Sequence, residues 1–114
     1  MSDINIESAD FESTGFQYTL SLLSGKYKMM ILYCLMEFKT VRFNELQRYL
    51  KNISDKTLSQ NLKELERDQL IHREVYPQIP PKVEYSLTEQ GRSMNSIFQQ
   101  INSWGEAHKP YSES

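Results

Sequence analysis

The sequence predicts an α+β fold that is mostly helical, and three observations lead to this prediction. Two amphipathic segments, 44–50 and 54–68, are separated by only three residues, which is the spacing of a helix-turn-helix. Two segments in which apolar and polar residues alternate follow directly and predict a β-hairpin. A long helical stripe of apolar residues then closes the chain. Together these elements predict a winged helix-turn-helix, in which the two-stranded β-hairpin is the wing.

The two ends of the chain differ in composition from its middle. Residues 1–13 are acidic and too polar to bury much surface, so we expect a flexible acidic arm. Residues 14–107 contain all of the periodic segments and are expected to form a single domain, followed by a tail at 108–114. A chain of 114 residues is long enough for one domain with a modest core and no disulfide.

The first predicted helix begins near Phe16, where Phe16, Leu20 and Leu23 share one helical face and Gly25 provides a stop. The segment 26–38 is apolar almost all round after a basic start. Its Met and Leu content favours a buried helix over a buried strand.

The helix-turn-helix has recognisable caps. Asn44 is expected to cap the helix 44–50, with Gln47 at the capping-box position. Ser54 is expected to cap the helix 54–68. The second of these helices has two faces: Leu58, Leu62 and Leu65 on one, and the polar residues Lys56, Gln60, Lys63 and Arg67 on the other.

The wing is predicted from two alternating segments, "IHREVY" at 71–76 and "KVEYSL" at 82–87. Between them "PQIPP" contains three prolines, which cannot continue a ladder of strand hydrogen bonds. After the wing, a helix is expected to begin at Thr88 and to run without interruption. Its apolar stripe consists of Met94, Ile97, Phe98, Ile101 and Trp104.

The charge distribution is compatible with a nucleic-acid partner although the net charge is −2. Residues 1–25 contain four acidic residues and no Lys or Arg. Residues 26–92 contain twelve Lys and Arg against nine Asp and Glu, a local charge of +3. Electrostatic steering depends on the local field more than on the total charge, so the middle of the chain is the candidate binding region.

The polar face of the helix 54–68 is a candidate for insertion into the major groove of double-stranded DNA. Gln60 can bond bidentately to adenine, and Lys56 can donate to guanine. Glu64 lies in the half of the helix that we expect to leave the groove. The alternative is an ordinary solvated helix face. The residues expected nearest the DNA are Ser54, Lys56, Thr57, Ser59, Gln60 and Lys63, of which Ser54 and Thr57 would donate to phosphate.

Three further lysines are candidates for contacts with the DNA backbone. Lys26 and Lys28 open the buried helix at its positive end, and the alternative for each is simple solvent exposure. Lys82 flanks the tip of the wing, whose segment 76–83 is expected to contact the backbone or the minor groove.

Two apolar faces exceed what a small winged helix needs to cover its core. We expect a homodimer in which terminal helices pair across a two-fold axis, although the C-terminal stripe alone could also be core. A dimer would place two reading helices about 34 Å apart on an operator. The expected interface residues are Phe16, Leu20, Leu23, Met94, Ile97, Phe98, Ile101 and Trp104.

Three sequence blocks resemble the HxlR-type family of winged helix-turn-helix transcription regulators. They are "GKYKMMILYCL" at 25–35, the long block from "RFNELQ" to "LTEQGR" at 42–92, and "WGE" at 104–106. The likeness covers about residues 14–106. It implies a bacterial, dimeric DNA-binding regulator, often a repressor of nearby genes, whose terminal helices pair the subunits.

The sequence departs from the family pattern at three places. Tyr27 stands where the family usually has Trp, and Lys82 where it commonly has Arg, and both changes keep the physical character of the residue. Several members carry an oxidant-sensing cysteine about twelve residues before the "GK" motif, where this chain has Thr14. The one thiol, Cys34, lies in an apolar run and is expected to be core. We therefore expect no thiol switch.

No pattern in the sequence indicates an enzyme, a cofactor or a metal site. His72 and His108 are not surrounded by residues at metal-ligand spacing. A lone cysteine and the lack of a secretory signal favour the cytoplasm, and no apolar run approaches the roughly 20 residues of a membrane span. Two possibilities stay open: a winged-helix module for protein–protein interaction, and an unknown small-molecule effector at the dimer interface.

Overall fold

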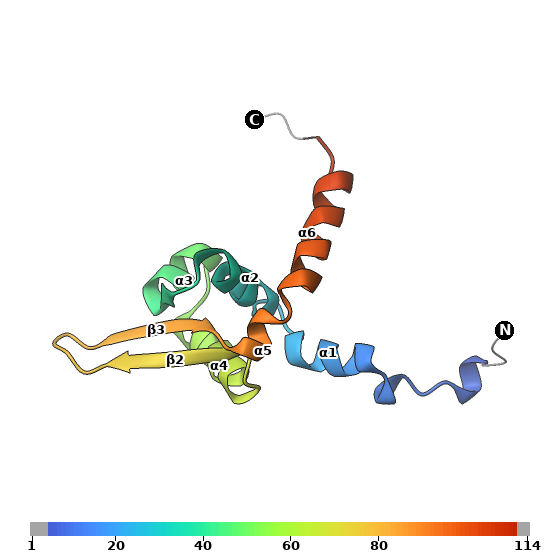
Figure 1. Cartoon of the computed structure of the whole chain (residues 1–114), viewed down its shortest axis with the longest axis horizontal. Helices are drawn as coiled ribbons and strands as arrows, with labels where there is room; N and C mark the ends of the chain where they lie inside the picture. Colours follow the sequence, from blue (N-terminus) through green and yellow to red (C-terminus); the bar gives the residue numbers. More distant parts are fainter. Residues whose placement is uncertain (1–4, 112–114) are drawn as a thin grey trace.

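The computed structural model describes residues 5–111 and confirms the predicted class, a mostly helical α+β fold (Figure 1). A central body contains a small sheet and most of the helices, and a helix leaves this body toward each end of the chain. The central helices are α2 (Lys28–Phe38), α3 (Phe43–Leu50) and α4 (Asp55–Arg67), and the terminal helices are α1 (Gly15–Leu23) and α6 (Asn95–His108).

The wing has the two predicted strands, β2 (Ile71–Tyr76) and β3 (Lys82–Leu87), paired antiparallel with Ile71 opposite Leu87. A third strand, β1 (Val41–Arg42), pairs with the other edge of β3, so the sheet order is β1-β3-β2. No element is predicted for this segment from the sequence. Two residues are too few to show an alternating pattern, so β1 is recognisable only from its partner strand.

The helix-turn-helix is confirmed, but the cap of its first helix is not the predicted one. Helix α3 begins at Phe43, and the backbone N–H of Arg42 donates to Oε1 of Glu45 at 2.8 Å. The predicted cap at Asn44 is therefore wrong, and Gln47 donates its amide to the Asp55 carboxylate at the start of α4. This hydrogen bond joins the two helices of the motif directly.

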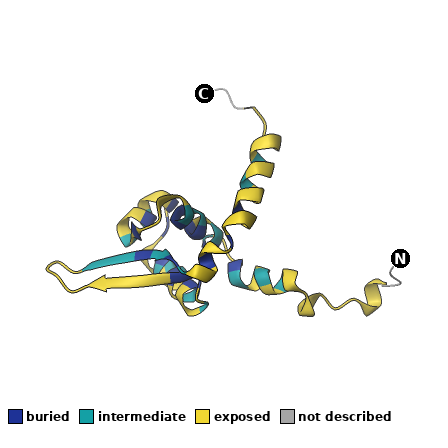
Figure 2. Ribbon diagram, in the orientation of Figure 1, coloured by how far each residue is buried: buried dark blue, intermediate teal, exposed yellow. Residues whose placement is uncertain are grey.

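The core lies where α2, α3 and α4 pack against the sheet (Figure 2). The leucines of α4 all point into it, as their helical spacing predicts. Cys34 on α2 is buried in the same core cluster, as expected. The largest fully buried side chains are those of Ile31, Leu32, Leu35, Leu46, Leu58, Leu65, Leu70 and Ile71.

The predicted uninterrupted C-terminal helix is divided into α5 (Glu89–Arg92) and α6. The helical segment begins at Thr88 as expected: the Thr88 hydroxyl caps α5 by accepting from the Gly91 N–H, and it donates to the carbonyl of Gln69 at 2.6 Å. Gly91 packs so tightly against Leu70 that a Cβ atom there would lie 2.1 Å from the Leu70 carbonyl oxygen. Helix α5 is thus attached to the end of the α4–β2 connection, a tertiary contact that local spacing does not reveal.

The terminal helices project from the central body (Figure 1). The radius of gyration is 17.4 Å, whereas a compact domain of this length has one of about 13 Å. Residues Ile6–Ser8 and Phe11–Ser13 of the predicted arm form short 3-10 turns. The arm's residues 1–4 and the tail's residues 112–114 lie outside the described part of the chain. No helix within residues 5–111 is long and apolar enough to cross a membrane.

Candidate nucleic-acid interface

Helix α4 separates its apolar and polar residues completely. Leu58, Leu62 and Leu65 are buried in the core. The opposite face carries Lys56, Gln60, Lys63 and Arg67, all of them exposed, while Thr57 and Ser59 at its edges are half-buried. No ion pair within residues 5–111 involves Lys56 or Lys63. The outward face therefore presents two free cations and an amide to solvent.

The N-terminus of α4 is closed by its own hydroxyl groups. Ser54 caps the helix as expected, because its Oγ accepts from the backbone N–H of Thr57 at 3.1 Å. The same hydroxyl donates to Oγ1 of Thr57 at 2.9 Å. Both side chains sit at the positive end of the helix dipole, where an approaching phosphate is stabilised.

Lys28 does not lie on the surface. Its side chain crosses from α2 to α4, where its Nζ lies 2.7 Å from Oε1 of Glu64 while the residue is only 5% exposed. The second carboxylate oxygen of Glu64 accepts from Nε2 of Gln60 at 2.6 Å. These hydrogen bonds, first that from Gln60 and then that from Lys28, lower the pKa of Glu64. The predicted contact of Lys28 with DNA is corrected: Lys28 is a buried ion-pair partner.

The other two lysines remain accessible to different degrees. Lys26 is exposed just before α2, with its Nζ 5.3 Å from the ring centroid of Tyr27. Lys82 is half-buried on the wing, with its Nζ 3.3 Å from Oε2 of Glu84 and 4.8 Å from the ring centroid of Tyr76. Lys82 would have to exchange the Glu84 carboxylate for a phosphate, whereas Lys26 has no ion pair to give up among the described residues.

The expected dimer residues divide into two groups. Leu23, Met94 and Phe98 are buried in the chain's own core, which corrects their assignment to an interface between subunits. They are buried because α1 ends, and α6 begins, against the central body. The other five remain exposed on the projecting helices: Phe16, Leu20, Ile97, Ile101 and Trp104.

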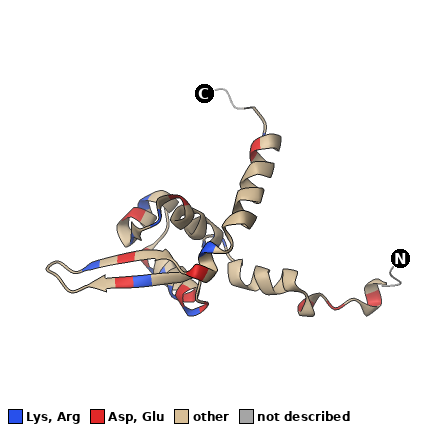
Figure 3. Ribbon diagram, in the orientation of Figure 1, with Lys and Arg blue, Asp and Glu red and all other residues tan. Residues whose placement is uncertain are grey.

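The projecting helices are almost uncharged (Figure 3). Helix α1 contains no charged residue, and Glu106 is the one acidic residue of α6, which has no Lys or Arg. Trp104 is 67% exposed although it stacks on His108, with 4.2 Å between the ring centroids. Most charged residues lie instead on the central body and the wing, and the N-terminal arm carries further acidic residues.

The comparisons with known proteins agree with this arrangement. The HxlR-like helix-turn-helix family matches residues 22–113. The chain belongs to this family. An uncharacterized HTH-type transcriptional regulator of Halalkalibacterium halodurans is 47% identical over 105 residues, which cover 92% of this chain and 93% of that protein.

Two solved structures are similar over most of their length. The crystal structure of the HTH-type regulator YtcD, a Bacillus subtilis protein, gives a TM-score of 0.78 at 44% identity, covering 83% of this chain and 96% of that one. The reduced form of the redox regulator HypR gives 0.80 at 43% identity, covering 84% and 94%. This HxlR-like protein is therefore a transcriptional regulator with a helix-turn-helix DNA-binding domain, and the prediction that it is not an enzyme is confirmed.

The redox character named for HypR belongs to that protein, and the thiol of this HxlR-like regulator is poorly placed for it. Burial, and to a smaller degree the carboxylates of Glu37 and Glu45, raise the pKa of Cys34 to about 11. The thiolate is the reactive form, so Cys34 is protonated and inaccessible at neutral pH. Thr14 caps α1 by accepting from the backbone N–H of Gln17 at 3.0 Å.

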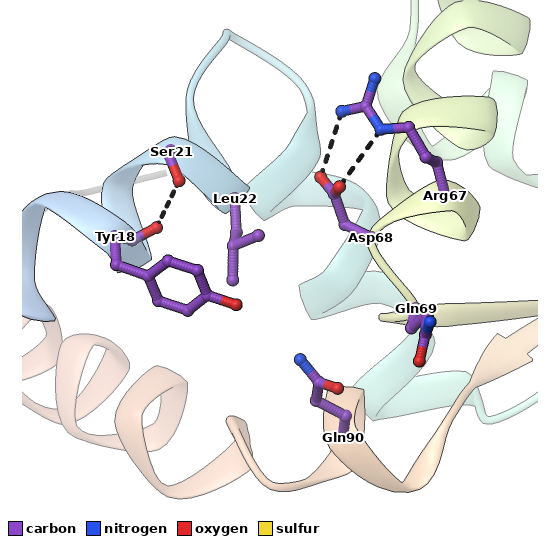
Figure 4. Close-up of a pocket in the computed structure, with 7 residues that line it drawn as sticks. All are labelled: Tyr18, Ser21, Leu22, Arg67, Asp68, Gln69 and Gln90. Atoms are coloured by element: carbon purple, nitrogen blue, oxygen red, sulfur yellow. Dashed lines mark hydrogen bonds and ion pairs between the residues drawn. The ribbon is translucent and has the colours of Figure 1, made fainter.

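A polar hollow of about 580 Å³ lies between α1, the C-terminal end of α4 and α5 (Figure 4). The side chains of Arg67 and Asp68 point at each other there, with Nε and Oδ1 separated by 3.2 Å. Their charges compensate one another, so the hollow offers no free charge to a ligand. Within residues 5–111 no three His, Cys, Asp or Glu side chains gather into a group that could hold a metal ion.

The contacts of Glu64 are not indicated by the sequence pattern that places it in the half of the helix expected to leave the groove. That placement stays a prediction, and the carboxylate accepts a hydrogen bond from Gln60 on the same face. The i,i+4 spacing of Gln60 and Glu64 was a usable signal for this contact. Nothing local could have indicated Lys28, which comes from another helix.

Proposed function

We propose that this HxlR-like regulator is a homodimeric, sequence-specific repressor that reads the major groove with α4 and contacts the DNA backbone or minor groove with the wing. One observation carries the proposal: the outward face of α4 presents Lys56, Gln60 and Lys63 and no aromatic, Met or Leu side chain. A major groove about 12 Å wide admits one such helix. Binding to the chromosome would take place in the cytoplasm.

Within this proposal the residues divide by what they would contact. Gln60 would bond to an adenine edge and Lys56 to a guanine edge, since these pairings match donors and acceptors in the groove. Ser54, Thr57 and Ser59 lie at the edge or the N-terminal end of α4, where phosphates pass. Lys26, Lys63 and Lys82 would add contacts that hold the protein in register without reading sequence.

Dimerisation is supported by the shape and charge of the chain ends. Helices α1 and α6 carry exposed aromatic and aliphatic side chains, including Phe16 and Trp104, on segments that are nearly free of charge. Clustered apolar side chains exposed on a monomer are typical of an interaction surface. A second copy of the chain would cover both helices across a two-fold axis and would set the spacing of two α4 helices.

The rival proposal is a winged-helix module for protein–protein contact, which the net charge of −2 would suit. Salt dependence separates the two, because each phosphate neutralised by a cation adds about −0.9 to the slope of log K against log salt concentration. We expect binding to random duplex DNA that weakens steeply with salt, measured by fluorescence anisotropy. A flat salt response, or no binding at low salt, would favour the rival.

Two substitutions test the division between base and backbone contacts. Gln60→Ala should cost about 1–3 kcal/mol on the preferred sequence and little on others, because a bidentate base contact is lost. Lys26→Ala should weaken all sequences alike and make the salt slope shallower by about one. If both variants lowered affinity uniformly, Gln60 would not be a base-reading residue.

Repression itself is tested at the protein's own upstream region. We expect a footprint there, and increased transcription from that promoter when the gene is deleted. Decreased transcription after deletion would make the protein an activator. A small-molecule effector is proposed to act near the dimer face, where an apolar hollow of about 280 Å³ lies between α2, the end of α3, and α6. Gel shifts with candidate metabolites would detect it as release of the operator.

A further inference from the structure

The buried lysine of α2 requires an explanation. A lysine is almost never buried without a partner, because removing its ammonium group from water is costly. Lys28 is 5% exposed and forms an ion pair with Glu64, whose Oε1 lies 2.7 Å from the lysine Nζ. Glu64 is itself about one-third exposed and lies on α4, so the buried charge supports a group on the outward side of that helix.

The remaining oxygen of this carboxylate determines the orientation of Gln60. Oε2 of Glu64 lies 2.6 Å from Nε2 of Gln60. A carboxylate accepts hydrogen bonds and has no proton to donate, so only the NH₂ end of the glutamine amide can face it. The carbonyl oxygen of Gln60 therefore points away from Glu64 and remains free to accept.

We propose that Lys28 and Glu64 act as positioning residues that make Gln60 discriminate adenine from guanine in the major groove. The inference rests on the proposed function. Adenine presents an acceptor at N7 and a donor at N6, whereas guanine presents two acceptors, N7 and O6. With one amide proton given to Glu64, Gln60 retains one proton for N7 and its oxygen for the N6 amino group. Opposite guanine, the same oxygen would face O6, and two acceptors would meet.

Lys28 contributes by keeping the carboxylate in place and electrically compensated. Without the ammonium group, Glu64 would carry an uncompensated negative charge on the face that approaches phosphates. The two hydrogen bonds on Glu64 lower its pKa, so the carboxylate is ionised and acts only as an acceptor at neutral pH. Ordering the flexible glutamine before DNA arrives also reduces the entropy lost on binding.

The test is selection from a library of random duplexes by the full chain, followed by sequencing of the bound DNA. We expect a position where the wild type prefers adenine over guanine by about 5- to 150-fold. Glu64→Ala and Lys28→Met should each reduce this ratio by about fivefold or more, with preferences at other positions unchanged. The Met variant keeps the length and apolar character of the lysine stem.

Controls separate positioning from a structural role. Glu66→Ala removes an exposed carboxylate from the same helix and should leave the ratio intact. Adding Lys28→Met to Gln60→Ala should reduce the ratio no further, because the group being positioned is already gone. Circular dichroism checks folding, and Glu64→Ala carries the test alone if the buried Lys28 site does not tolerate methionine.

The outcomes distinguish this inference from the proposed function. If Gln60→Ala abolishes the adenine preference while Glu64→Ala and Lys28→Met keep it, the positioning role is wrong and the proposed function stands. If the variants bind all duplexes more weakly but at an unchanged ratio, Lys28 and Glu64 support the fold only. If the wild type shows no base preference at all, both the inference and sequence-specific reading by α4 are overturned.

Discussion

The centre of this regulator and its two ends differ in how much of their apolar surface the chain itself covers. In the centre, Leu58 and the other leucines of α4 are buried, and only polar groups face outward. At the ends, α1 and α6 bury one residue each, Leu23 and Phe98, and leave Phe16 and Trp104 exposed. The apolar stripe of α4 is therefore covered within the chain, whereas the projecting helices leave most of their apolar side chains exposed.

This difference shows that amphipathic periodicity alone does not say what a face is for. Helices α4 and α6 both have regular apolar stripes, but all the leucines of the α4 stripe are buried in the core. On α6 the stripe divides, because Phe98 points to the body while Ile101 and Trp104 lie further along a helix that has left it. Both the direction in which a side chain points and its distance from the core decide whether it is buried, since Ile97 is exposed although its neighbour Phe98 is buried.

The largest expected effect is at the ends. Trp104→Ala should leave a folded chain but weaken the proposed dimer by about 3–5 kcal/mol, because a large aromatic surface is lost from the interface. Sedimentation velocity across a concentration series measures this. Gln99→Ala, an exposed polar change on the same helix, serves as the control and should remain dimeric. A Trp104→Ala profile that is still dimeric at low micromolar concentration would show that α6 is not the interface.

In the centre, Leu58→Ala should lower the free energy of unfolding by about 2–5 kcal/mol, since a fully buried side chain is replaced by a cavity. Urea denaturation followed by circular dichroism gives the value. Leu20→Ala, the same change on the projecting α1, sharpens the comparison. Its cost should depend on protein concentration, because it acts through dimerisation. Equal and concentration-independent costs would erase the distinction between centre and ends.

The smallest expected effect is that of oxidants on the centre. Burial raises the pKa of Cys34 to about 11, so the thiolate becomes populated only well above neutral pH. Treatment with mild diamide at pH 7 should leave DNA binding unchanged in a gel shift, and Cys34→Ser should alter stability more than regulation. Release of the operator by diamide in the wild type, abolished in Cys34→Ser, would contradict this.

The elements that sequence could predict are those with long periodic segments. Helix α4, both wing strands and the Ser54 cap all follow from local spacing, and the structure has them at nearly the predicted bounds. Strand β1 is only two residues long and shows no period. The break between α5 and α6 and the contact of Gly91 with Leu70 have no counterpart in the local sequence pattern.

The candidate site was predictable only in the part that follows from helical periodicity. The outward residues of α4, such as Lys56 and Gln60, follow from helical geometry. The burial of Lys28 does not, because it depends on where α2 crosses α4, and its basic neighbour Lys26 is exposed. Two lysines separated by one residue thus have opposite environments, which composition and spacing cannot distinguish.

The close packing of Gly91 against the Leu70 carbonyl also makes α5 the joint through which α6 is connected to the central body. Helix α6 has 14 residues and so extends about 21 Å beyond it, at 1.5 Å per residue. A tilt of about 5° at this joint would carry the far end of the helix sideways by nearly 2 Å. A methyl group at Gly91 would collide with the Leu70 carbonyl oxygen. A shift of α5 that relieved this collision would also move α6. The direction of the C-terminal helix therefore depends on the Gly91 contact together with the Thr88–Gln69 hydrogen bond and the burial of Phe98, and none of these residues is proposed to touch DNA.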